Sequence, residues 1–164
     1  MDSGPSTHEG NHASGDAPMR ALTLTQPWGT LVAIGAKCIE TRSWRTGHRG
    51  PVAIHAAFGW PQYARDFAER FDVRMIGEEI VGSRVLTWNE RLEVDRGHVL
   101  ATASLVGVER ITATTPRVSD QERLLGDYRP GRWAWVLEDV KELEFPVEAR
   151  GHLGLWTWTP EAAA

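Results

Sequence analysis

Short apolar runs recur along most of the chain and predict a domain rich in strands. The longest run, HVLATASLVGVERI, covers residues 98–111 and predicts a core strand with a bend or bulge at Gly107. The segments RWAWVLEDV, KELEFPVEA and LGLWTWT then predict three further strands in succession. In chain order, the predicted strands cover residues 21–25, 38–44, 51–57, 98–111, 132–140, 141–149 and 153–159.

Two helices are predicted in the first half of the chain. Gln26-Pro27 opens the first, because proline is tolerated in the first turn of a helix, where its missing N–H is not needed. Gly35 follows WGTLVAI at a position where a glycine in a left-handed cap commonly ends a helix. The second helix covers WPQYARDFAERFDV, in which aromatic residues recur at helical spacing. These residues are Tyr63, Phe67 and Phe71.

A third helix is predicted over residues 119–125, with Ser119 as its N-cap and Glu122 three residues later. Residues 74–97 predict no clear element, and each half of that segment is compatible with a short helix or a loop. Strands and helices do not alternate as they would in a parallel sheet. The pattern therefore predicts an α+β fold, a mixed and mostly antiparallel β-barrel of about six strands with two or three helices at its openings.

The length of 164 residues predicts one folded domain, which we expect to span residues 19–160. Residues 1–18 are small, polar and glycine-rich, and we expect them to form a disordered tail. They lack the basic start and apolar stretch of a secretory signal, and no apolar run approaches the length of a membrane span. Cys38 is the only cysteine, which excludes an intrachain disulfide, and we expect it to be a small buried residue. A cytoplasmic location is the expectation.

The net charge of −4 comes from the two ends of the chain. Four acidic residues lie in the tail and at the C-terminus, and the remaining 18 are balanced by 18 lysines and arginines. Residues 20–49 are locally basic and residues 138–148 are locally acidic. A neutral total argues against sequence-independent binding to duplex DNA, which depends on many phosphate contacts. A local basic patch fits a small or single-stranded anionic ligand.

The segment GAKCIETRSW, residues 35–44, carries three charges where a half-buried strand would alternate apolar and polar residues. Lys37 is one of only two lysines against 16 arginines, so we interpret it as a functional ammonium or titratable amine. Glu40 and Arg42 are two positions apart and point to the same face of a strand. They form either a structural ion pair or part of a site in which Glu40 acts as a base or accepts from a nucleobase amine.

Five motifs together resemble the ASCH domain family, a branch of the PUA-like barrels. They are QPWGTLVAIGAKCIETRSW (26–44), RGPVAIHAA (49–57), the central strand ending in GVERI, GRWAWVL (131–137) and GHLGLWTW (151–158). The resemblance covers residues 20–158. It implies a small β-barrel with a cleft beside the first helix, and contact with RNA, nucleotides or nucleosides. Some members of the family deacylate modified cytidine, and some are linked to RNA cleavage.

Other candidate ligand-binding residues lie around this motif. Trp28 and Trp44 flank it and offer rings on which a base could stack. Arg45 and Arg49 form a basic turn that could reach phosphates. His55 ends a strand, where histidine is more often a hydrogen-bonded structural residue than a catalyst. The spacing of the histidines fits no metal site, and the sequence predicts neither a metal nor a cofactor.

The residues leave open whether the chain is a binding module or an enzyme. As a module it would recognise RNA, a nucleotide or a nucleoside in the cleft. As an amide hydrolase of acylated cytidine it would use Lys37 or Glu40 for proton transfer, with Glu109 or Glu122 as a further acid. In the deacylating relatives a threonine follows the lysine by three residues, whereas Glu40 stands there in this chain. A ribonuclease would use Glu40 as base and Lys37 with Arg42 as a phosphate clamp.

Overall fold

The computed structural model describes residues 17–81, 86–113 and 118–160. The strands are β1 (Met19–Leu24), β2 (Ile39–Arg42), β3 (Gly50–Ala56), β4 (His98–Arg110), β5 (Trp133–Glu148) and β6 (Leu155–Trp158). The helices are α1 (Trp28–Ala33), α2 (Gln62–Ala68), α3 (Phe71–Val81), α4 (Trp88–Asp95) and α5 (Asp120–Leu125). The α+β class is therefore confirmed. Residues 1–16 of the predicted tail lie outside the described residues, and β1 begins at Met19.

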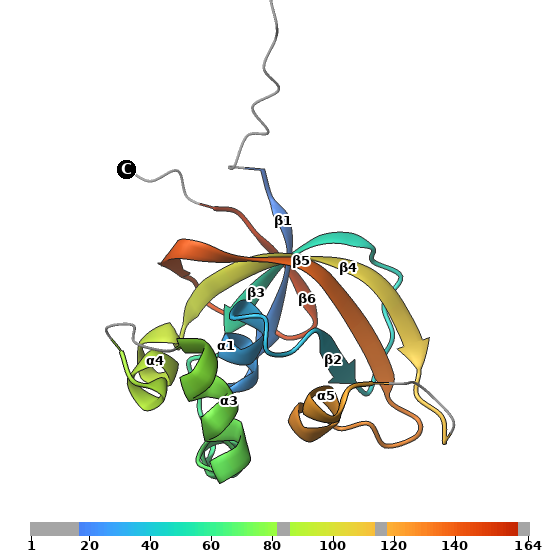
Figure 1. Ribbon diagram of the computed structural model, residues 1–164. Coiled ribbons are helices and arrows are strands. Elements are labelled where there is room, and N and C mark those ends of the chain that lie inside the picture. The colour runs from blue at the N-terminus through green and yellow to red at the C-terminus, as the bar shows by residue number, and fades with distance from the viewer. Residues whose placement is uncertain (1–16, 82–85, 114–117, 161–164) are drawn as a thin grey trace, which may run out of the picture.

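All six strands belong to one curved sheet in the order β2-β5-β4-β3-β1-β6 (Figure 1). Only β1 and β3 pair in parallel, and the other neighbours are antiparallel. The predicted closed barrel is wrong, because the described strands form no ladder between β2 and β6. Each of these edge strands has only four residues and pairs on one side. Short edge strands limit the unpaired backbone that an open sheet exposes.

Strand β5 is a single strand of 16 residues where the sequence predicted two. A bulge lies where the break was expected. Ser104 and Thr102 are two positions apart on β4, but their partners on β5, Glu138 and Lys141, are three positions apart. Asp139 has a φ of 50° within this bulge. A bulge bends a strand without ending its ladder, which explains why no turn was needed. The bend expected at Gly107 is confirmed by a second register shift there.

The described residues contain five helices, more than the two or three predicted. The helix predicted over 60–73 is interrupted, since α2 ends at Ala68 and α3 begins at Phe71. Ala64 and Ala68 form the buried face of α2, whereas Tyr63 and Phe71 are 65% and 81% exposed. The aromatic spacing therefore predicted helical structure here, but these two aromatic side chains are not its buried face. The segment 74–97, which predicted no clear element, contains most of α3 and all of α4.

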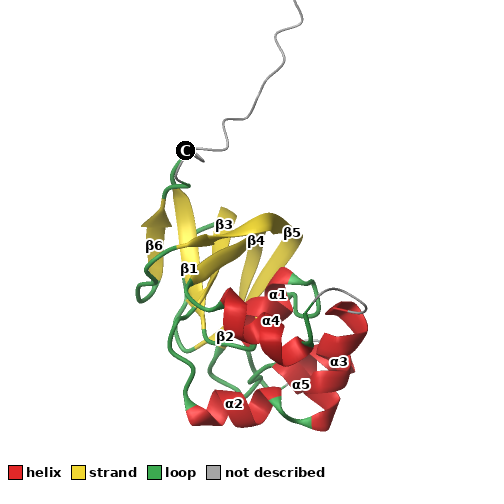
Figure 2. Cartoon of the chain, turned by 90° about the vertical axis from the view of Figure 1, so that its left-hand side faces the viewer, coloured by secondary structure: helices red, strands yellow, loops and turns green. Residues whose placement is uncertain are grey.

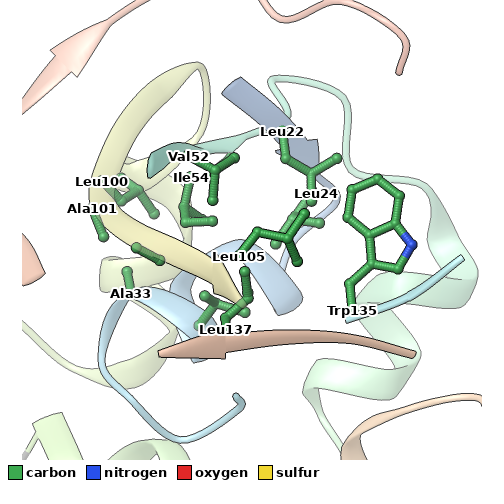
Figure 3. Close-up of a cluster of buried hydrophobic side chains, with 13 residues drawn as sticks. Leu22, Leu24, Ala33, Val52, Ile54, Leu100, Ala101, Leu105, Trp135 and Leu137 are labelled. Carbon is green, nitrogen blue, oxygen red and sulfur yellow. The ribbon is translucent and has the colours of Figure 1, made fainter. Parts of the chain in front are cut away.

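Helix α1 lies between the sheet and the other helices. On one side, Val32 and Ala33 pack with side chains from β1, β3, β4 and β5, which converge on one another in Figure 3. On the other side, Leu31 packs with Trp88 of α4 and Leu125 of α5. The helices gather at one end of the sheet (Figure 2). This arrangement fixes the end of α1 against both the sheet and the other helices. The segment that follows α1 is thereby fixed as well.

Gly77 in α3 lies directly against the Trp88 ring, so we expect Gly77→Ala to destabilise the fold. A Cβ at this position would come within 2.5 Å of two ring atoms of Trp88, which is fully buried. Overpacking of this kind costs about 1–3 kcal/mol, measurable by urea unfolding. Gly47→Ala is the control, because no atom lies within 4 Å of its Cβ position. Equal stability of the two variants would contradict the packing that we describe.

Candidate functional site

The turn after α1 directs Lys37 into the protein. Helix α1 ends at Ala33, and Gly35 adopts a left-handed φ of 78°, as the sequence predicted for a helix-ending glycine. The Lys37 side chain that follows is only 1% exposed. Cys38 is exposed, so the prediction that it is buried is wrong. The turn explains the difference, because it points Lys37 inward and leaves its neighbour on the outside.

Glu122 of α5 meets this turn from the other side of the site. Its Oε1 accepts a hydrogen bond from the backbone N–H of Cys38, and its Oε2 accepts one from the Tyr128 hydroxyl at 3.1 Å. The Nζ of Lys37 lies 3.7 Å from the same Oε2 and donates to the carbonyl of Ile39. Of the two acids left open by the sequence, Glu122 contacts Lys37, whereas Glu109 is exposed on β4.

The ring of Tyr128 packs beside Lys37, whose Nζ lies 5.9 Å from the centre of that ring. Burial raises the pKa of Tyr128 far above its usual range, and the nearby carboxylates of Glu122 and Glu40 raise it further. The hydroxyl therefore stays protonated and remains a hydrogen-bond donor. A Cβ at Gly126 would lie 3.1 Å from the Lys37 Nζ and 2.6 Å from the Tyr128 ring, so the backbone approaches closely here. Lys37 is thus enclosed by an acid, a phenol and main chain.

The side chains of Glu40 and Arg42 point to the same face of β2, as their spacing predicted. The Nε of Arg42 lies 3.2 Å from Oε1 of Glu40, and its Nη2 donates to the carbonyl of Thr23 at 2.8 Å. The Nε is buried but makes no aligned hydrogen bond in the described structure. The pair therefore interacts mainly through charge. The described residues provide no hydrogen-bond donor to the Glu40 carboxylate, so its oxygens are available as acceptors.

Of these groups, Lys37, Glu40 and Arg42 border a cleft of about 460 Å³. It lies between the end of β1, α1, β2, α2 and the loop that follows α5. The lining residues are Thr23, Leu24, Thr25, Trp28, Lys37, Glu40, Thr41, Arg42, Ser43, Trp44, Tyr63, Phe67, Leu125, Gly126, Asp127 and Arg132. Five residues that the sequence singled out are thereby brought together, namely Trp28, Lys37, Glu40, Arg42 and Trp44.

The aromatic side chains of the cleft differ in how much of each ring is free. Trp28 stacks on Phe67 with ring centres 4.9 Å apart, and its Nε1 donates to the carbonyl of Leu125 at 2.9 Å. Trp44 is half-buried and lies nearly perpendicular to Trp135, with the ring centres 4.7 Å apart. Tyr63 is largely exposed. The rings of Trp44 and Tyr63 are thus less engaged within the protein than that of Trp28.

Sequence reasoning missed the lining residues from α2 and from the loop after α5. Tyr63 and Phe67 are four positions apart on α2, which places both on one helix face and could have indicated a surface beside the site. Asp127 and Arg132 lie in a charged loop, where Arg132 donates to the carbonyl of Thr41 at 2.9 Å. The hydrogen-bonded guanidinium of Arg129 lowers the pKa of Asp127 to about 2, so this acid is ionised at neutral pH.

Three predicted ligand-binding residues do not line the cleft. The Arg45 guanidinium lies over the ring of Trp133, 5.5 Å from its centre. Arg49 donates to carbonyls of its own turn. His55 is buried and its Nε2 donates to the carbonyl of Ala149 at 2.9 Å. Burial lowers the pKa of His55 below its usual 6.5, which indicates a neutral structural imidazole.

Within the part of the chain that the structure describes, no group of three or more His, Cys, Asp or Glu residues is arranged to hold a metal ion. None of the described helices combines the length and the apolar character needed to span a membrane.

We expect the stabilities of Lys37→Met and Glu122→Gln to be coupled. Either change leaves a largely buried charge without its partner, at a cost of about 3 kcal/mol in the free energy of unfolding. The double variant removes both charges, so its cost should fall below the sum of the two by roughly 1–3 kcal/mol. Urea unfolding of all four proteins measures this difference. Strict additivity would show that the two side chains do not interact.

We expect His55→Gln to reduce the pH dependence of stability. The folded pKa of His55 lies below the unfolded value of 6.5, so the unfolded chain binds a proton first as the pH falls. Stability from this group is complete above pH 6.5 and is lost as the pH falls towards the folded pKa. The melting temperature of the wild type should therefore drop more than that of the variant between pH 7 and 5. His98 and His152 lie near His55 and are present in both proteins. Parallel curves would contradict a neutral buried His55.

Comparison with known proteins agrees with the motifs in the sequence. A model of the ASCH domain matches residues 22–147, which is most of the chain. No curated protein is found to match it. Every residue that lines the cleft lies within the matched range. The chain therefore belongs to the ASCH domain family.

Proposed function

We propose that the chain binds a nucleoside unit, either free as a nucleotide or within RNA, in the cleft beside α1. The observation that carries this proposal is the meeting of aromatic rings and paired ionic groups around about 460 Å³. Sites for small ligands commonly have volumes of roughly 300–1,000 Å³, with apolar walls and a few polar groups that fix orientation. A nucleoside presents both kinds of surface, since its base is flat and its edges are polar.

The flat faces of the base would stack on the aromatic side chains. Stacking of a base on an aromatic ring contributes about 1–3 kcal/mol and is available to every base. Trp44 and Tyr63 are the best candidates, because Trp28 already gives one face to Phe67. Tyr63 is also exposed to solvent, so stacking would cover an apolar ring that the protein alone leaves in water.

The edge of the base would be recognised by Glu40 and Arg42. The Glu40 carboxylate receives no hydrogen bond from the described residues and accepts donors such as the exocyclic amines of cytosine or adenine. The partly exposed guanidinium of Arg42, which lines the cleft, supplies donors beside it. A donor and an acceptor side by side suit the polar edge of a nucleobase, and each would gain a partner that the protein does not provide.

The charges of the cleft are nearly balanced. Lys37 faces Glu122, Arg42 faces Glu40 and Arg132 faces Asp127. Such a cleft supports binding of one nucleotide rather than strong attraction to many phosphates. We therefore expect a shallow salt dependence, with a log–log slope of about −0.7 to −1.4 if one or two phosphates of a single strand are neutralised.

An amide hydrolase acting on acylated cytidine is the second candidate, and the contact between Lys37 and Glu122 favours it. In this reaction water adds to the acyl carbonyl, the C–N bond breaks and the amine of cytidine takes up a proton. Lys37 and Glu122 would accept the proton that water releases and donate the proton that the amine takes up. Glu40 stands where the deacylating relatives carry a threonine, and the Tyr128 hydroxyl stays protonated, so water rather than a side chain would be the nucleophile. A ribonuclease would need Glu40 as its base, because no histidine is among the described residues that line the cleft.

We expect Glu40→Gln to weaken binding of CMP and AMP about tenfold while changing that of UMP much less. The amide loses the charge that strengthens hydrogen bonds from exocyclic amines, which UMP lacks. Titrations followed by tryptophan fluorescence measure the three affinities, and Glu109→Gln serves as a control for the change in net charge. Failure of all four ribonucleoside monophosphates to bind the wild type would refute the proposal.

Product analysis separates binding from catalysis. The wild type is incubated with N4-acylated cytidine and, separately, with a short RNA. Release of cytidine and free acid would favour the hydrolase, and shortened RNA would favour the ribonuclease. Intact substrates together with saturable binding would favour the binding module. Lys37→Met should abolish hydrolysis if Lys37 transfers the proton.

A further inference from the structure

A row of side chains crosses three strands beside the cleft. In the sheet, Arg42 of β2 lies opposite Trp133 of β5, and Trp133 lies opposite Arg110 of β4. The strands that carry this row lie side by side near α5 in Figure 1. Neighbouring strands are about 4.8 Å apart, so the backbones of Arg42 and Arg110 are separated by about 10 Å. The row therefore extends from a residue that lines the cleft to the outer surface.

The row lies on the same face of the sheet as the cleft. Trp133 and Trp135 are two positions apart on β5, and their side chains share one face. Trp135 is fully buried in the cluster that contains α1, which identifies this face as the one that bears the cleft. Arg42, directly opposite Trp133, lines the cleft itself. A ligand chain that leaves the cleft past Arg42 would meet Trp133 next.

Two arginines that form no ion pair with a described carboxylate lie over the Trp133 indole. The guanidinium of Arg110 lies 5.3 Å from the centre of the Trp133 ring, and that of Arg45 lies 5.5 Å from it. Both arginines are exposed, and neither forms an ion pair with any of the described residues. Two acids that line the cleft are paired with other arginines, since Glu40 faces Arg42 and Asp127 faces Arg129 and Arg132.

We propose that Arg45, Trp133 and Arg110 form a phosphodiester-binding surface that holds the nucleotide next to the one in the cleft. None of the described acids forms an ion pair with either guanidinium, so each can make a charge-assisted contact with a phosphate oxygen. The guanidinium groups already cover the indole, so the surface suits a phosphate better than a stacked base. This inference rests on the proposed function and names its ligand class, a single-stranded nucleic acid.

The test compares the protein's affinity for one nucleotide with its affinity for a strand. Wild type is titrated with the four ribonucleoside monophosphates, and then with a hexamer of the best-bound base, as RNA and as DNA. We expect the hexamer to bind at least tenfold tighter than the monophosphate. Arg45→Gln/Arg110→Gln should remove most of this gain, leave monophosphate affinity within twofold and make the salt slope shallower by about 1.4. Both arginines are exposed, so the variant should fold, which circular dichroism checks.

Arg74→Gln/Arg150→Gln is the matched control. It removes the same charge from exposed positions on α3 and beyond the far end of β5. A similar loss of hexamer affinity in this control would overturn the proposal and indicate diffuse attraction. Hexamers that bind no tighter than a monophosphate would overturn it too, while leaving the proposed function intact. If no monophosphate binds, the proposed function fails and the inference fails with it. A gain for both RNA and DNA supports the shared phosphodiester, and a gain for RNA alone identifies RNA as its source.

Discussion

The carboxylate of Glu122 holds the two walls of the cleft together. It accepts a hydrogen bond from the backbone of Cys38, accepts another from Tyr128 and faces the ammonium of Lys37. A largely buried carboxylate is stable only with such partners, because its desolvation is otherwise uncompensated. The turn after α1 and the segment around α5 are therefore fixed to each other. The bond from Trp28 to the carbonyl of Leu125 joins the same two segments a second time.

The arrangement of charge divides the site into two regions. Inside the cleft each cation faces an acid, so recognition there depends on hydrogen-bond geometry and stacking more than on net attraction. Beside the cleft, Arg45 and Arg110 lie over the ring of Trp133 and form no ion pair with an acid in the described part of the chain. A low overall charge and a local capacity for anions are therefore compatible in one small domain.

The sequence predicted the local features better than the long-range ones. Gly35, Lys37, Glu40 and Arg42 follow from a helix stop and strand alternation, which are decided by neighbouring residues. Closure of the sheet was predicted wrongly, because it depends on whether two distant edge strands meet. Tyr63 was missed because its spacing with Phe67 predicts a helix but does not show which face of that helix borders the cleft. Glu122 could not be chosen over Glu109 until the fold brought α5 to the turn after α1.

Residues that contact each other around the cleft are far apart in the sequence, and this separation determines when the cleft can form. Cys38 and Glu122 are 84 residues apart, and among the described strands β2 pairs only with β5. Contacts between distant residues require closure of long loops, and they form late in folding. On the ribosome, the strand within the GAKCIETRSW segment therefore lacks its partner strand until β5 has been synthesised. A fragment that stops before residue 122 contains this whole motif but cannot build the site, so the motif alone in a shorter chain is not sufficient evidence of a binding cleft.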